Sequence, residues 1–391
     1  MFGKKIHLFT LFGFEVSIDF TWFLLAILVA WSLAESYFPT EYGKERSRAV
    51  YWWMGAGGAL GLFLSIVFHE FWHSVIARHY GLPMKGITLF LFGGVAEMED
   101  EPPNPKTEFL MAIAGPLSSV VLAGIFLAVY QGGIAANWPL SVWAVFKYLG
   151  QLNILLAVLN LAPAFPLDGG RVLRSILWAA KGDLRWSTRV AAAFGSAFGT
   201  LLILAGLLFI VLFGLGALVA GIWFALIGMF IRGAAQMSYR QVLIRNALGG
   251  ETVARFMEKN PITVPPTISV RELVTDYIYR YHYKMFPVAS DSTLQGCIST
   301  RQLKDIPQEL WSERRVQDVL APCSIETTIR PDTDAMKALA TMNRTGNSRL
   351  LVVEGDQLMG IVTLKDMLKF LNLKIDLGGN DDKQSPPRTS Q

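Results

Sequence analysis

Long apolar segments alternate with short charged stretches in the N-terminal part of the chain, over positions 1–235. The clearest apolar segment, Val190–Ile231, contains not one charged side chain. As a single helix it would be roughly 63 Å long, about twice the hydrocarbon thickness of a bilayer. It must therefore fold back, and Phe213-Gly214-Leu215-Gly216 is the predicted turn between two membrane-spanning helices.

Four earlier apolar segments bring the predicted number of spans to six: Phe20–Ala34, Ala49–Ile76, Phe109–Tyr130 and Val142–Leu161. Lys and Arg collect in alternate connections, whereas segments 131–141 and 213–217 contain neither. Only segment 36–48 carries basic residues against this pattern, together with acidic neighbours. Because basic connections face the cytoplasm, both termini are predicted to be cytoplasmic in a multi-pass protein of the cell membrane.

One segment between the spans does not have a helical pattern. Ile87–Met98 is short, contains glycines and is partly β-branched, which favours a strand or hairpin. Strand-like residues also fill Lys4–Phe20, before the first span, and can pair with it. The predicted fold of this part is an α-helical polytopic membrane domain with a small membrane-associated β-hairpin or sheet.

Composition narrows the class of protein. The chain is 52% hydrophobic and 17% charged, which is more apolar than most soluble domains, whereas the stretch 250–376 has an ordinary soluble mixture. A net charge of +4 is too small to argue for a nucleic-acid partner. Both cysteines, Cys297 and Cys323, lie in the soluble part and indicate no disulfide framework. Glu15 and Asp19 interrupt what would be the apolar core of a cleaved signal peptide.

A metal motif lies inside the second span. His69-Glu70-Phe71-Trp72-His73 is H-E-x-x-H, and on a helix two residues four apart share one face, so both imidazoles can reach one ion. Glu70 is placed to activate a water molecule. Such residues are costly in an apolar span unless paired or metal-bound, which favours a functional site. If the span ends near Arg78, His69 lies roughly 14 Å below the cytoplasmic surface.

A catalytic zinc takes three protein ligands and leaves one position open. His79 is off the shared face, and His7 and His282 lie in other regions. Asp168 is the better candidate because two prolines break the helix before it, and broken backbone at membrane depth is tolerated where it lines a wet cavity. On spacing alone, a second interpretation stays open, in which Asp168 only caps the helix beginning near Gly169.

The pairing of H-E-x-x-H with N-x-x-P-x-x-x-x-D-G, from Asn160 to Gly169, resembles the site-2 protease family of intramembrane metalloproteases. The resemblance covers the apolar part of the chain, positions 1–235. It implies that His69, His73 and Asp168 bind Zn²⁺ and that Glu70 is the catalytic base. It also implies that Asn160 contacts the substrate or the oxyanion.

The same resemblance implies a role for Gly93, Gly94 and Val95, which lie in a strand-forming segment that offers its edge to an unwound substrate. A purely structural role for this segment stays open. Ala114–Ser118, in the third span, contains small residues that permit close helix packing.

The soluble part contains an internal repeat. Two pairs of segments align: Leu294–Ser299 with Leu358–Thr363, and Phe286-Pro287-Val288 with Leu350–Val353. The separation in residue number between the two copies is nearly the same in both pairs. Each copy places a short helix between β-branched runs, which predicts two similar α/β units packed together.

These units resemble a tandem pair of cystathionine β-synthase (CBS) domains, a family that often binds adenine nucleotides. The resemblance implies that Gly360, Thr363 and Asp366 contact ATP or AMP. The first copy has Gln302 where Asp is expected, which puts its ribose contact in doubt. A CBS pair used only to form a homodimer is the alternative.

The predicted domains are a metalloprotease domain over residues 1–235, a connecting helix or linker over 236–252, CBS domains over 253–310 and 315–374, and a disordered tail over 377–391. We expect an endopeptidase that cleaves transmembrane or near-membrane segments of membrane-anchored proteins, with cleavage coupled to nucleotide level. A CBS-gated membrane metal or ion transporter is the rival hypothesis. A catalytically dead scaffold would be expected to have a broken H-E-x-x-H motif, and this one is intact.

Overall fold

The computed structural model describes residues 5–90, 93–98, 101–290, 293–324 and 326–378. The chain forms two compact units, Met1–Arg240 and Gln241–Gln391. Most of the tail predicted over 377–391 lies outside the described residues, and α13 of the second unit extends to Gly378.

The first unit is built from long apolar helices. Among the described residues, six helical segments are long and apolar enough to cross a membrane, which confirms the predicted number of spans. They are α1 (Thr21–Ser32) continued by a π-helical turn (Leu33–Tyr37) and α2 (Phe38–Tyr42), α3 (Arg48–His79), α4 (Pro105–Ala135), α5 (Leu140–Asn160), α7 (Leu184–Phe213) and α8 (Leu218–Leu248). A shorter helix, α6 (Asp168–Lys181), lies between α4 and α7.

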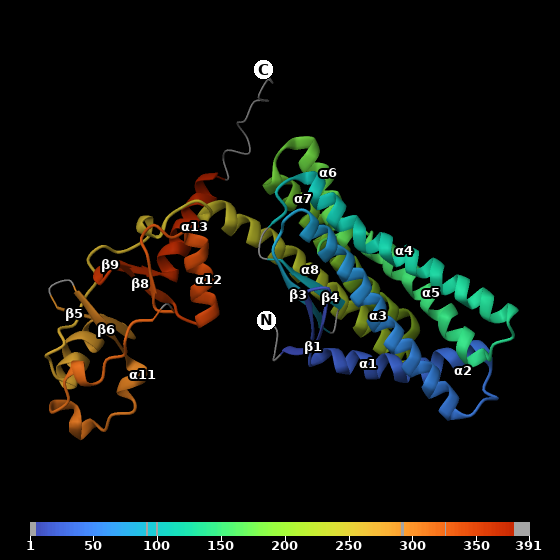
Figure 1. The fold of residues 1–391 in the computed structure, drawn as a ribbon, viewed down its shortest axis with the longest axis horizontal. Coiled ribbons are helices and arrows are strands. Elements are labelled where there is room, and N and C mark those ends of the chain that lie inside the picture. Colours follow the sequence, from blue (N-terminus) through green and yellow to red (C-terminus); the bar gives the residue numbers. More distant parts are fainter. Residues whose placement is uncertain (1–4, 91–92, 99–100, 291–292, 325, 379–391) are drawn as a thin grey trace, which may run out of the picture. The chain divides into compact units, whose positions relative to one another are not determined.

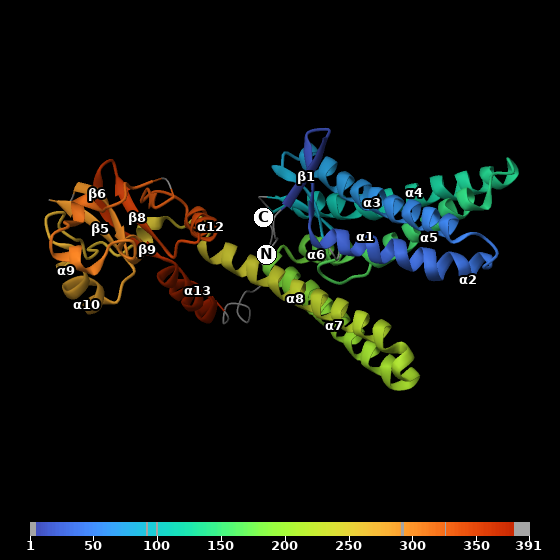
Figure 2. The same cartoon turned by 90° about the horizontal axis from the view of Figure 1, so that it is seen from below.

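Helices α3, α4 and α5 pack side by side (Figure 1). Helices α7 and α8 form a hairpin (Figure 2), joined by a 3₁₀ turn at Gly214–Ala217 where the sequence predicted a fold-back. Glycines bring these two helices into backbone contact, because a Cβ atom at Gly199 would lie 2.5 Å from the carbonyl oxygen of Gly228.

A four-stranded sheet covers part of α3. Its strands are β1 (Lys5–Leu11), β2 (Phe14–Asp19), β3 (Met84–Phe90) and β4 (Gly93–Met98), in the order β1-β2-β3-β4. The β2–β3 pair is parallel and the other two pairs are antiparallel. Apolar residues of β2 and β3 pack on Phe63 and Val67 of α3. The expected pairing of the N-terminal segment with the hairpin is present, and β4 lies at an edge of the sheet.

The second unit contains two similar α/β halves. The first comprises α9 (Val270–Glu272), a π-helical turn (Leu273–Ile278), α10 (Tyr279–Tyr281), β5 (Met285–Ser290), β6 (Thr293–Ser299) and α11 (Thr300–Leu303). The second comprises β7 (Thr328–Ile329), α12 (Ala335–Thr345), β8 (Arg349–Glu354), β9 (Gln357–Thr363) and α13 (Leu364–Gly378). Both halves contribute to one sheet in the order β5-β6-β9-β8-β7, and the antiparallel β8–β9 hairpin repeats the β5–β6 hairpin as the internal alignment predicts.

Helix α8 belongs to both units. It begins as the last apolar span and continues without a break to Leu248, whose side chain is buried in the core of the second unit with Val253 and Leu350. Of the stretch predicted as a connecting helix or linker, residues 236–248 are therefore a direct continuation of the span.

Candidate metal centre

Three of the side chains singled out in the sequence meet in the first unit. His69 and His73 lie one turn apart on α3, and Asp168 is the first residue of α6. Nε2 of His69 is 3.0 Å from Oδ2 of Asp168 and 3.1 Å from Nε2 of His73, and Nε2 of His73 is 3.3 Å from the same carboxylate oxygen. Both imidazoles are 5% exposed. Three donor atoms converge on one point where an ion can bind.

Helix α4 orients both imidazoles. Nδ1 of His73 donates to the carbonyl oxygen of Met111 at 2.6 Å, and Nδ1 of His69 lies 2.9 Å from Oγ of Ser119. A donated hydrogen bond from Nδ1 leaves Nε2 with its lone pair free, which is the form that binds a metal. Two histidines and one carboxylate with an open fourth position are the donor set of a catalytic zinc.

Asp168 does not cap its helix. Residue Leu167 occupies the N-cap of α6 with no side-chain cap, and the carboxylate of Asp168 points to the imidazoles. The preceding loop folds tightly against the first turn of α6, because a Cβ atom at Gly169 would collide with the carbonyl oxygens of Leu161 and Ala162. Of the two interpretations that spacing left open, the geometry therefore favours the inward-facing carboxylate.

Gly115 of α4 lies directly against the three donor atoms. A Cβ atom at this position would lie 2.5 Å from Nε2 of His69 and closer still to Nε2 of His73. The sequence suggested only that this residue permits close helix packing. No local signal marks Gly115 as lying against the imidazoles, because any residues of a helix that are spaced by four share one face.

Glu70 lies beside the edge strand. A Cβ atom at Gly94 of β4 would lie 2.6 Å from Cγ of Glu70 and 3.1 Å from its Cδ. Gly93 and Val95 flank Gly94 on β4 and pair with Phe90 and Thr88 of β3. In the described residues β4 has a strand partner on one side only, and the Glu70 side chain lies against the face of this edge strand at Gly94.

Asn160 is not one of the three residues whose donor atoms converge. It is the last residue of α5 and is half-buried, and the tight turn that follows leads to Asp168. His79 lies away from the cluster, as expected from its helix position.

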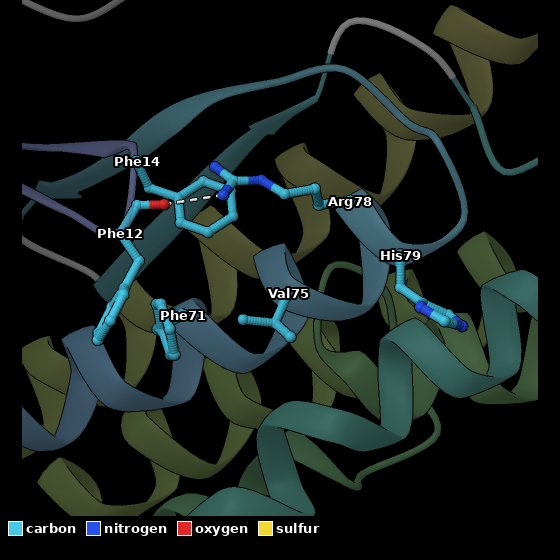
Figure 3. Close-up of a pocket in the computed structure, with 6 residues that line it drawn as sticks. All are labelled: Phe12, Phe14, Phe71, Val75, Arg78 and His79. Atoms are coloured by element: carbon cyan, nitrogen blue, oxygen red, sulfur yellow. Dashed lines mark hydrogen bonds between the residues drawn. The ribbon is translucent and has the colours of Figure 1, made fainter.

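A cavity of about 360 Å³ on α3 contains none of the three clustered residues (Figure 3). It is lined by Phe12, Phe14, Phe71, Val75, Arg78 and His79. Arg78 donates from Nη1 to the carbonyl oxygen of Phe12 at 2.8 Å, and its guanidinium lies 3.6 Å from the ring centre of Phe14. These contacts tie the β1–β2 turn to α3 and hold the sheet against the helix that carries His69 and His73.

The predicted nucleotide residues lie around the start of α13. Oγ1 of Thr363 donates to Oδ2 of Asp366 at 2.5 Å and accepts from the backbone N–H of Asp366 at 3.2 Å. In the first half, Gln302 takes the equivalent place and its Oε1 accepts from the N–H and hydroxyl of Ser299. Gly360 has a packing role as well, because a Cβ there would lie 2.5 Å from the carbonyl oxygen of Glu258.

Two family models match this chain. The one described as peptidase family M50 matches residues 57–134 and 127–204, and the CBS domain model matches residues 253–308 and 316–373. Rip3 of Mycobacterium tuberculosis is 35% identical over 365 residues, which is 92% of this chain and 91% of that protein. The zinc metalloprotease MJ0392 of Methanocaldococcus jannaschii is 30% identical over 370 residues, 94% of this chain and 96% of that protein. A solved site-2 protease from Methanocaldococcus jannaschii, 30% identical with a TM-score of 0.42, covers 61% of this chain and 96% of its own.

The position of Gly115 yields a first prediction. Replacing Gly115 by Ala places a methyl group against both Nε2 atoms, so the purified protein should bind zinc at least about tenfold more weakly although all three donor residues remain. Metal content by mass spectrometry after dialysis checks this. Gly124→Ala on the same helix is the matched control, since its Cβ meets nothing within 4 Å. Equal zinc content in both variants would contradict the prediction.

Proposed function

Since the chain belongs to the zinc metalloproteases of peptidase family M50, the site-2 proteases, and carries a tandem CBS pair, we propose that it is an intramembrane endopeptidase. Its substrates are membrane-anchored proteins, cut within or near a transmembrane segment. The observation that carries this proposal is the buried cluster of His69, His73 and Asp168 inside a bundle of apolar helices, with Glu70 one residue away on α3.

His69, His73 and Asp168 would hold the zinc ion. When bound, zinc polarises the carbonyl group that is attacked and lowers the pKa of water. Glu70 accepts the proton of the attacking water and returns it to the leaving amine, which is the role of a general base and then acid. Both histidines are 5% exposed, so little of either side chain is in contact with bulk water.

The unpaired edge of β4 is the proposed substrate contact. A peptide bond inside a helix is shielded by its own hydrogen bonds, so the substrate must be extended before it can be cut. Backbone groups of an extended segment can pair with Gly93–Val95, which places the segment beside Glu70. Asn160 is proposed as a further substrate contact at the end of α5, on the strength of the family motif.

Basic residues in the connections support a topology with both termini and the second unit in the cytoplasm. In this topology the C-terminal end of α3 is nearer the cytoplasm than its N-terminal end. His73 lies less than two turns before His79, the last residue of this helix. Cytoplasmic water therefore has the shorter route to Glu70.

Replacing Glu70 by Gln tests the proposed base. The amide keeps the shape of the carboxylate but cannot take a proton, so cleavage of a membrane-anchored reporter in liposomes should fall roughly 100- to 10,000-fold. Zinc content should stay at the level of the unmodified protein. Equal cleavage by both proteins would show that Glu70 is not the base. Zinc flux without cleavage by the unmodified protein would instead favour a transporter.

A second proposal concerns the CBS pair, in which Gly360, Thr363 and Asp366 contact an adenine nucleotide that modulates cleavage. A carboxylate that accepts ribose hydroxyl groups contributes charge-assisted hydrogen bonds. Asp366→Ala should therefore weaken ATP or AMP binding to the full chain about tenfold or more, measured by calorimetry.

Asp332→Ala is the matched control for this substitution, because Asp332 is an exposed carboxylate of the same unit that pairs only with exposed Arg330 among the contacts described. If neither nucleotide binds the unmodified chain and the chain is a dimer, the pair serves dimerisation instead. Unchanged cleavage across physiological ATP concentrations would contradict the regulatory part.

A further inference from the structure

Asp168 differs from the two histidines in how its position is fixed. Helix geometry places His69 and His73 on one face of α3, so their separation needs no further support. Asp168 begins another helix, after a loop that runs from Leu161 to Leu167. The position of its carboxylate relative to the imidazoles therefore depends on whatever holds that loop.

Phe165, three positions before Asp168, is a buried residue of this loop. It is 5% exposed and packs against Ala191 and Ala192 of α7 and Ala235 of α8. Its backbone touches α7 directly, because a Cβ atom at Gly195 would lie 2.8 Å from the backbone N of Phe165 and closer still to its carbonyl oxygen. Any side chain at position 195 would push this loop away from α7.

The ring of Phe165 is also held from within α6. The guanidinium of Arg174 lies 5.3 Å from the ring centre, and Nε of Arg174 donates to Oε1 of Glu108 at 2.6 Å. Glu108 belongs to α4 and is 0% exposed. Arg174 is 5% exposed, so the pair is shielded from solvent, and removal of Arg174 alone would leave the buried charge of Glu108 without this partner.

Glu108 lies one turn before Met111, the residue whose carbonyl group accepts from His73. The pair of Glu108 and Arg174 therefore joins the helix that orients the imidazoles to the helix that carries Asp168. Phe165 contacts Arg174 of this pair and also packs against the α7–α8 hairpin, so both sets of contacts meet the loop at this residue.

We infer that Phe165, held by Arg174 on one side and by Gly195 on the other, is a positioning residue that sets the distance of the Asp168 carboxylate from His69 and His73. This inference rests on the proposed zinc site. It means that zinc binding also requires the packing of a residue that neither sequence motif specifies. Zinc affinity then depends on the α7–α8 hairpin, although among the described residues this hairpin contributes none of the three clustered side chains.

The test uses the full-length chain carrying Glu70→Gln, so that zinc binding is measured without proteolysis. Phe165→Leu keeps an apolar side chain but removes the ring, and Gly195→Ala adds a methyl group against the Phe165 backbone. Gly233→Ala, on α8, is the control because its Cβ meets nothing within 4 Å. Zinc affinity is measured by chelator competition, ligand geometry by the visible spectrum of the Co²⁺-substituted protein, and folding by the melting temperature of the chelated protein.

We expect zinc to bind about tenfold more weakly to Phe165→Leu and Gly195→Ala, with an altered Co²⁺ spectrum, and Gly233→Ala to match the parent. A lower melting temperature with unchanged zinc affinity and an unchanged spectrum would reduce Phe165 to a packing residue and overturn the inference. Failure of the parent itself to bind zinc would instead overturn the proposed zinc site, so the two failures are distinguishable.

Discussion

Two imidazoles and a carboxylate lie buried among apolar helices, and each of their polar atoms needs a partner. In a bilayer an unpaired polar group costs several kcal/mol, so such groups persist only with compensating contacts. Here Nδ1 of each imidazole is paired with α4, and Nε2 of each faces the same carboxylate oxygen of Asp168. That pairing leaves the Nε2 atoms of both imidazoles facing Asp168, the first residue of α6.

Helix α4 is consequently the organising element of the first unit. It supplies the hydroxyl group of Ser119 and the carbonyl group of Met111 to the imidazoles, and Gly115, which has no side chain, lies against both of them. It also pairs Glu108 with Arg174 of α6. A helix outside the three-residue cluster thus fixes the relative position of the two elements that carry the cluster.

The parts of this protein that follow from local periodicity were predictable from the sequence. The length of the apolar segments gives the six spans and the turn at Gly214, helical spacing gives the shared face of His69 and His73, and the internal repeat gives the two halves of the second unit. What depends on tertiary contact was not predictable. Nothing local distinguishes Gly115, which must clear two imidazoles, from Gly124 on the same helix, which meets nothing. The stretch after the last apolar span was predicted only as a connecting helix or linker, because Arg232, Arg240 and Arg245 end the charge-free run without ending the helix.

The proposed pairing of substrates with the edge strand beside Glu70 has a consequence for which proteins would be cut. Backbone pairing along β4 is blind to side-chain identity, since every residue except proline offers the same N–H and C=O groups. A substrate that pairs there must first give up part of its own helix. On that proposal, selection falls on the free energy of unwinding, so a transmembrane segment rich in Gly or β-branched residues would be cut more readily than a Leu-rich one of equal length. Such an enzyme would discriminate by the low stability of a helix rather than by a sequence motif.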